Sequence, residues 1–98
     1  MTPAISVHPL AEQELNDTAS YHNAASSGLG ATFLAEAERA IRRIQLQPEA
    51  APVVYGMVRR KLIRCFPYSV MYSVQAGTIR ILAIANQKRR PFYWRGRA

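Results

Sequence analysis

The spacing of apolar residues changes halfway along the chain, and this change limits the folds available to it. In residues 9–46 the apolar positions recur every three or four residues, which places them on one face of a helix. From residue 57 to residue 85 they occur instead in short runs rich in Val, Ile, Tyr and Met, as in strands. Two helices followed by several strands are therefore predicted. The clearest helical stripe consists of Phe33, Leu34, Ala37, Ala40, Ile41 and Ile44.

Short signals mark where these elements begin and end. Residues 4–8 form an opening strand that stops at Pro9, and Pro9 suits the first turn of a helix. The segment SSGLG at residues 26–30 separates two helices, and a turn at Gln75–Thr78 joins the last two strands. The later strands are expected at residues 57–65, 68–74 and 78–85. The order β-α-α-β-β-β predicts one α+β domain over residues 1–98, with a helical hairpin on one face of a mainly antiparallel sheet.

Charge is divided unevenly between the two halves of the chain. All six acids lie in residues 1–49, where three arginines leave a net charge of −3. Residues 50–98 hold ten Lys or Arg residues and no acid, a net charge of +10. This division favours a polyanionic partner, either nucleic acid or an acidic protein. The alternative is a soluble surface with a basic bias.

Composition disfavours several classes of protein. No apolar run reaches the roughly 20 residues of a membrane helix, the first ten residues do not resemble a signal peptide, and one cysteine cannot form an internal disulfide. A cytoplasmic protein without membrane attachment is expected. His8, His22 and Cys65 lack metal-ligand spacing, so no metal or other cofactor is predicted. Cys65 is expected to pack as a small apolar residue in a strand, and Glu12 and Glu14 to be charges at a helix start.

The chain ends in a basic and aromatic tail, residues 86–98 (NQKRRPFYWRGRA). Arginine binds phosphate bidentately, and Tyr93 and Trp94 can stack on unpaired bases. Equally, these two residues and Phe92 can form a hydrophobic plug that closes the sheet edge. Either register of the strand at residues 57–65 places at least two cations on the sheet face opposite the helices. The candidates for binding a target or partner are Arg59, Arg60, Lys61, Arg64, Arg80, Lys88, Arg89, Arg90, Tyr93, Trp94 and Arg95.

Three long segments carry a recognisable family pattern: GLGATFLAEAERAIRRIQLQPEAAP, GMVRRKLIRCFPYSVMYSV and ILAIANQKRRPFYWRGR. They resemble the RelE/ParE superfamily, the toxins of bacterial type II toxin–antitoxin modules, also known as plasmid stabilisation proteins. The resemblance extends from Ile5 to Arg97 and is sharpest at the Gly-Leu-Gly helix start, at Arg64–Tyr72 and at Lys88–Trp94. It implies the fold predicted above and an acidic antitoxin that wraps the basic surface. A homodimer or a heterotetramer with antitoxin is the assembly that the resemblance suggests.

The resemblance also implies two alternative targets. ParE-like members poison DNA gyrase and are not known as nucleases. RelE-like members cut mRNA on the ribosome with basic residues and a tyrosine. Carried over onto this chain, the nuclease residues are Arg64, Lys88, Arg89 and Tyr93.

Two positions depart from the nuclease pattern. Ser69 stands where RelE-like nucleases have an arginine, and Asn86 stands where close relatives with the same ending commonly have a histidine. Asparagine cannot act as a general base near neutral pH. A ParE-like toxin that is not a nuclease is therefore the favoured interpretation. The alternatives are a metal-independent, ribosome-dependent endoribonuclease and an inactive module that binds only its antitoxin or nucleic acid.

Overall fold

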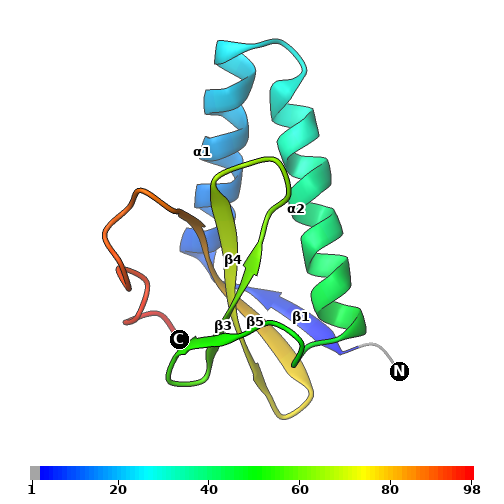
Figure 1. The fold of residues 1–98 in the computed structure, drawn as a ribbon, viewed down its shortest axis with the longest axis vertical. Coiled ribbons are helices and arrows are strands. Elements are labelled where there is room, and N and C mark those ends of the chain that lie inside the picture. Colours follow the sequence, from blue (N-terminus) through cyan, green and yellow to red (C-terminus); the bar gives the residue numbers. More distant parts are fainter. Residues whose placement is uncertain (1–2) are drawn as a thin grey trace.

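The computed structural model describes residues 3–98 (Figure 1). One strand is followed by two helices and then by four more strands. The predicted α+β class is confirmed, with one more short strand than expected. The elements are β1 (Ala4–Val7), α1 (Pro9–Ala25), α2 (Leu29–Leu46), β2 (Val53–Tyr55), β3 (Val58–Leu62), β4 (Tyr68–Gln75) and β5 (Thr78–Asn86).

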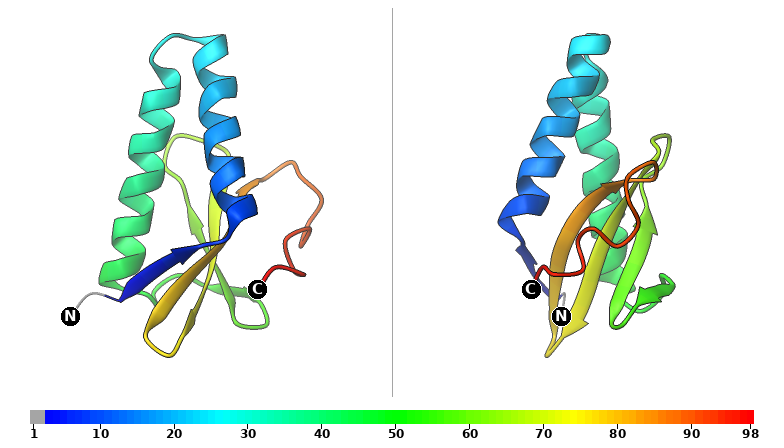
Figure 2. Two further views of the ribbon diagram at one scale, coloured as in Figure 1. Left: turned by 180° about the vertical axis from the view of Figure 1, so that it is seen from behind. Right: turned by 90° about the vertical axis from the view of Figure 1, so that its left-hand side faces the viewer.

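All five strands form one sheet in the order β1-β5-β4-β3-β2. β1 runs parallel to β5, and the other neighbours are antiparallel, so the sheet is mainly antiparallel as predicted. A parallel pair needs a long crossover connection. The α1–α2 hairpin lies within that connection and covers one face of the sheet (Figure 2). Neither helix of the described chain is long and apolar enough to cross a membrane.

The core lies between the helical hairpin and the sheet. Phe33 and Ile44 of α2 are at most 1% exposed, and they belong to one cluster with Tyr72 of β4 and Ile79 of β5. Ile41, in the same predicted stripe, is only partly buried at the margin of this cluster. The apolar stripe of α2 therefore faces the sheet, as its spacing predicts, except at Leu34, which is 39% exposed.

Glycine allows the two helices to pack closely. A Cβ atom at Gly30 would lie 2.5 Å from the backbone oxygen of Ala19 and 2.9 Å from Cβ of Asn23, both on α1. Gly28, at the start of α2, has φ of 87°, and its N–H donates to the side chain of Asn23 at 2.9 Å. The Gly-Leu-Gly sequence thus provides both the turn and the close approach.

A tight turn joins β4 to β5 where the sequence predicts one. Ala76 and Gly77 both have positive φ, at 51° and 75°, as a two-residue hairpin turn requires. Because β4 and β5 pair over their full length, this hairpin forms the centre of the sheet.

The segment around residues 53–65 differs from expectation in two ways. β2 is an edge strand of three residues between Pro52 and Gly56, too short to show a periodic pattern. The strand expected over residues 57–65 ends at Leu62, because the chain turns there. Cys65 lies in this turn with φ of 70° and is exposed, so the prediction that it packs inside a strand was wrong.

Candidate functional site

The tail, residues 86–98, folds back onto the sheet face that the helices leave open (Figure 2). Its anchor is Trp94, which is 3% exposed and packs against Met71 of β4 and Ala83 and Ala85 of β5. The hydrophobic-plug alternative therefore describes Trp94. The expectation that Trp94 stacks on an unpaired base is corrected, because protein already covers its ring.

Two further aromatic residues form an exposed apolar patch beside this anchor. The rings of Tyr55 and Phe92 lie 5.4 Å apart, and both residues remain more than one-third exposed. Phe92 was predicted as part of the tail. Tyr55 is not among the candidate binding residues predicted from the sequence, because it lies in a segment expected to be a connection. Its aromatic character is the one sequence feature that could have indicated a role in this patch.

Glu14 of α1 holds the far end of the tail. Its carboxylate accepts two hydrogen bonds from the Arg97 guanidinium, at 2.9 and 3.0 Å, and one from the Tyr93 hydroxyl at 2.9 Å. It also accepts a hydrogen bond from the backbone N–H of Ile84 at 3.0 Å. The interpretation of Glu14 as only a helix-start charge was therefore wrong. No local pattern predicts these bonds, because the partners lie 70 to 83 residues further along the chain.

Tyr93 is held as a hydrogen-bond donor. Burial, followed by the hydrogen bond to Glu14 and the charge of Glu14, raises the pKa of the Tyr93 hydroxyl well above its ordinary value. The charges of Arg89 and Arg97 oppose this shift without cancelling it. The Arg89 guanidinium carbon lies 4.1 Å from the centre of the Tyr93 ring, a cation–π distance. At neutral pH Tyr93 is protonated, and its proton is directed at Glu14.

A pocket of about 510 Å³ lies between the tail and the sheet. Its cations are Arg60 of β3 and Arg89 and Arg90 of the tail, and none of its lining residues is acidic. Ser69 lies in its wall with a buried hydroxyl oxygen that has no hydrogen-bond partner. A lining of guanidinium, hydroxyl and aromatic groups can bind a phosphate or a carboxylate.

Other predicted binding residues stabilise the fold. Arg59 donates to the carbonyl oxygens of Glu49 at 2.9 Å and Ala51 at 2.7 Å. Arg80 donates to the terminal residue Ala98 at 3.1 and 3.2 Å. These hydrogen bonds use part of the donor capacity that a partner would need.

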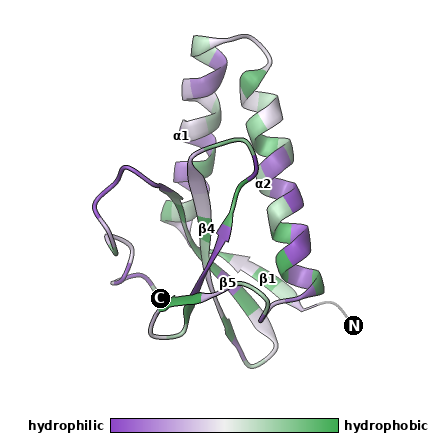
Figure 3. Ribbon diagram, viewed as in Figure 1, coloured by the Kyte–Doolittle hydropathy of each residue, from purple (hydrophilic) through white to green (hydrophobic). Residues whose placement is uncertain are grey.

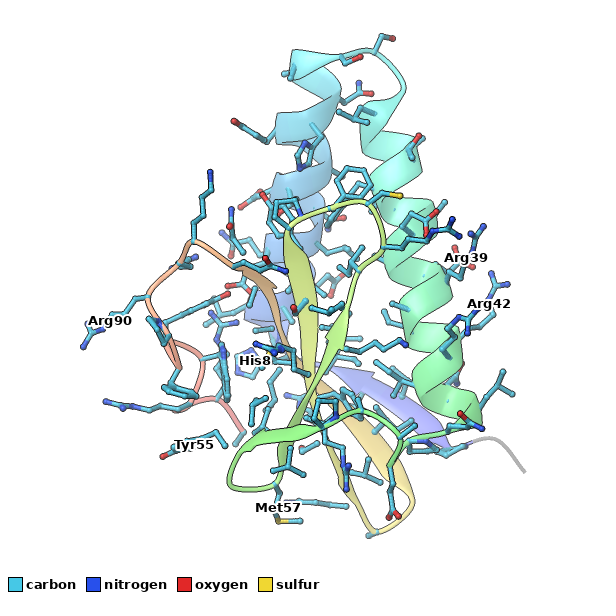
Figure 4. The ribbon with its side chains drawn as sticks, viewed as in Figure 1. His8, Arg39, Arg42, Tyr55, Met57 and Arg90 are labelled. Carbon is cyan, nitrogen blue, oxygen red and sulfur yellow. The ribbon has the colours of Figure 1, made fainter. Side chains whose placement is uncertain are left out.

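The remaining tail cations are exposed. Lys88, Arg90 and Arg95 all face solvent, and Arg90 projects away from the sheet (Figure 4). In Figure 3 the tail and the middle of β3 are hydrophilic, whereas β5 is mostly hydrophobic. The exposed cations of the tail are therefore available to a partner.

Fewer strand cations face the tail than predicted. Arg60 pairs with Met71 and shares the open face, whereas Arg59 and Lys61 pair with Tyr72 and Val70 on the helix side. The chain turns before Arg64, so Arg64 does not continue the alternation of β3 side chains between the two faces of the sheet. The prediction of at least two cations from this strand on the open face was wrong.

The four nuclease candidates do not converge on one place. Arg89 and Tyr93 meet in the tail, but Arg64 lines a separate depression beside α2 with Arg39 and Lys61. Lys88 is exposed at the turn after β5 and does not line the tail pocket. Within residues 3–98, no three His, Cys, Asp or Glu side chains lie close enough together to hold a metal ion.

Comparison with solved structures defines the class of this fold. A structure titled "Chromosomal ParDE TA system from P. aeruginosa" matches with a TM-score of 0.77, over 87% of this chain and 96% of that chain, at 15% sequence identity. The chain therefore shares its fold with a chain of that structure. No curated protein matches the sequence.

The sequence itself gives the family. The family model described as the ParE toxin of the type II toxin–antitoxin system parDE matches residues 5–91. The chain belongs to this ParE toxin family and is a toxin component of a type II toxin–antitoxin module. The RelE/ParE resemblance predicted from the three segments is confirmed.

Proposed function

We propose that this toxin acts on DNA gyrase in the cytoplasm and is not a nuclease. The observation that carries the proposal is the state of Tyr93, the tyrosine expected to move a proton in a nuclease. Its hydroxyl donates to Glu14 at 2.9 Å, and its pKa is raised, so it cannot act as a base near neutral pH. Asn86, whose amide donates to the Tyr68 hydroxyl at 3.3 Å, offers no base in its place.

We also propose that an acidic antitoxin neutralises the toxin by binding its basic half. Residues 50–98 carry ten cations and no acid. The three acidic side chains that form ion pairs in the structure, Glu14, Glu36 and Glu38, all come from the helices. An acidic partner would balance the remaining charge and associate rapidly through electrostatic attraction. A homodimer or a heterotetramer with antitoxin stays a prediction.

The second candidate function is ribosome-dependent mRNA cleavage. The pocket lined by Arg60, Arg89 and Arg90 favours it, since its lining is basic and arginine binds phosphate. In this case Tyr93 would have to leave Glu14 before it could act. A third candidate, an inactive module, would bind a partner without harming the cell.

Induction of the toxin in growing bacteria separates these candidates. We expect double-strand breaks in the chromosome and intact mRNA, because a gyrase poison leaves DNA cut. A Lys88→Glu/Arg90→Glu variant, which reverses two exposed tail charges, should produce fewer breaks. Cuts in mRNA at fixed codon positions without DNA breaks would establish the nuclease instead. Normal growth with abundant folded toxin would favour the inactive module.

A further inference from the structure

A small depression beside α2 surrounds one carboxylate with four cations. Its volume is about 260 Å³, and it shares only Leu62 with the pocket beneath the tail. It lies across the molecule from the tail, on the side where Arg39 projects from α2 (Figure 4). We call it the Glu36 depression. Its charged lining residues are Glu36, Arg39, Arg43, Lys61 and Arg64.

The sequence of α2 places three of these side chains on one face of the helix. Glu36, Arg39 and Arg43 are three and four residues apart, and side chains at this spacing are neighbours on a helix surface. Ala40 lies among them and is 4% exposed, and its single methyl group leaves open the space that a longer side chain would fill. The helix therefore supplies one carboxylate and two guanidinium groups around a gap.

The end of β3 and the turn after it supply the other two cations. Lys61 pairs with Val70 on the sheet face that the helices cover, so its side chain is directed toward α2. Arg64 follows Ile63, which is 2% exposed and donates its backbone N–H to the carbonyl of Tyr68 at 2.9 Å. The sheet therefore fixes the backbone from which both cations extend.

Most of the positive charge in the Glu36 depression has no acidic partner. Glu36 forms an ion pair with Arg39 alone, and the two charged atoms lie 3.4 Å apart. Across residues 3–98, no acidic side chain forms an ion pair with Arg43, Lys61 or Arg64. These cations repel one another, so an anion bound among them would stabilise the folded protein.

The carboxylate of Glu36 has acceptor capacity that the protein does not use. The side chain is 15% exposed, and one carboxylate oxygen accepts a hydrogen bond from Arg39 at 3.4 Å. The other oxygen is buried and has no hydrogen-bond partner within the part of the chain that the structure describes. A buried acceptor without a partner costs free energy. A ligand that donates a hydrogen bond to this carboxylate would remove the cost.

Two requirements therefore define the ligand: negative charge for the cations, and a hydrogen-bond donor for the carboxylate. Hydrogen phosphate meets both near neutral pH, because it is an anion that keeps a P–OH group, and arginine binds its other oxygens. Sulfate has no proton and would direct a lone pair at Glu36. Phosphate monoesters lose their last proton near about pH 6 and then resemble sulfate in this respect.

We propose that the Glu36 depression is an anion site that binds hydrogen phosphate and discriminates against sulfate. Arg39, Arg43, Lys61 and Arg64 hold the charge, and the carboxylate of Glu36 accepts the P–OH proton in a hydrogen bond. The proposal rests on neither the gyrase target nor the antitoxin. A bound phosphate would also neutralise part of the basic surface on this side of the molecule.

Titration of the full toxin with sodium phosphate, sodium sulfate or methyl phosphate tests the site. Calorimetry at neutral pH and constant ionic strength gives the three dissociation constants. We expect phosphate to bind about tenfold or more tightly than either of the other two anions, the factor that one hydrogen bond to a charged group supplies. Equal affinities for the three anions, or no binding of phosphate, would overturn the proposal.

Two carboxylates of α2 provide a matched pair of variants. Glu36→Gln should abolish the preference for phosphate, because its amide group can donate a hydrogen bond to sulfate as well. Glu38→Gln should keep the preference, since Glu38 is exposed and pairs with Arg42 at 2.7 Å outside the depression. A Glu36→Gln protein that favours phosphate as strongly as the wild type would contradict the role of the carboxylate.

A third variant tests the location of the site without altering a partly buried residue. Arg64 is exposed, so Arg64→Ala should keep the wild-type melting temperature in the absence of phosphate. We expect it to weaken phosphate binding about tenfold and to reduce the rise in melting temperature that phosphate produces. Unchanged phosphate affinity in Arg64→Ala would place the ion elsewhere on the basic surface and overturn the assignment.

Discussion

At the residue scale, Glu14 decides how the tail is held. Among the acids of residues 3–98, Glu14 alone forms hydrogen bonds with the tail, and it brings together α1, β5 and two tail residues, Tyr93 and Arg97. Its hydrogen bonds to Arg97 also raise the pKa of that guanidinium. The side chains of Glu14 and Arg97 are only 15% and 12% exposed, so water weakens their attraction little.

Replacing Glu14 should therefore destabilise the protein. We expect Glu14→Gln to lower the free energy of unfolding by about 2 kcal/mol, because it leaves Arg97 partly buried without its counter-charge. The melting temperature should fall by about 10 °C. Glu12→Gln, on the exposed side of the same helix, is the control and should change the free energy by less than about 0.5 kcal/mol. Equal melting temperatures for the two variants would show that Glu14 does not hold the tail.

Tyr93 should give the stability a dependence on alkaline pH. The fold keeps the Tyr93 hydroxyl protonated to a higher pH than the unfolded chain does, where it titrates near about pH 10. The protonated Tyr93 hydroxyl therefore makes its full contribution to the free energy of unfolding below that pH, and this contribution is lost as the pH rises above it. Urea unfolding at pH 9 and pH 11 should show a smaller decrease in Tyr93→Phe than in the wild type. An identical decrease in both proteins would contradict the raised pKa.

At the element scale, the helical hairpin depends on one close contact. Gly30 of α2 lies so close to Ala19 and Asn23 of α1 that a side chain would displace one of the helices. The long apolar stripe of α2 then reaches the sheet, with Ile44 1% exposed. The hairpin is thus positioned by a glycine and by the stripe together.

Adding one methyl group should test this contact. We expect Gly30→Ala to cost about 1–3 kcal/mol, since the gain in helix propensity is smaller than the cost of overpacking. Gly96→Ala is the control, because a Cβ there meets nothing within 4 Å. Thermal unfolding measures both. A Gly30→Ala protein as stable as the wild type would mean that the helices can separate without penalty.

Elements with a strong periodic pattern could be predicted from the sequence, and short or irregular ones could not. α2 and the β4–β5 hairpin follow from the apolar spacing and from the Ala-Gly turn. β2 has three residues, too few to show a periodic pattern. Cys65 lies in a turn with positive φ, which no pattern of side chains predicts. The Glu14 contacts arise only when the fold brings distant segments together. For the same reason the sequence could list the cations, but it could not show which of them line the tail pocket and which line the depression beside α2.

At the scale of the whole molecule, charge is segregated between the helices and the strands with the tail. All six acids precede residue 50, and ten of the thirteen cations follow it. The basic half presents two depressions, one beneath the tail and one beside α2, which meet at Arg60 and Leu62. Both depressions are lined by cations, as an acidic partner requires.

This segregation predicts that antitoxin binding depends on salt. Raising the salt concentration from about 0.05 M to about 0.3 M shortens the screening length and should weaken the wild-type complex about tenfold. The Arg89→Glu/Arg90→Glu variant should bind more weakly and respond less to salt, because it removes two of the attracting charges. A dissociation constant that does not change with salt in either protein would show that apolar contacts alone hold the complex.

The most direct measurement of the central claim is DNA supercoiling by purified gyrase in the presence of the toxin. Relaxed plasmid, gyrase and ATP are mixed with increasing toxin, and the fraction of supercoiled plasmid is measured with and without equimolar antitoxin. We predict that supercoiling falls as toxin increases and returns when antitoxin is added. Full supercoiling at a large excess of toxin, from a preparation that still binds its antitoxin, would contradict gyrase as the target.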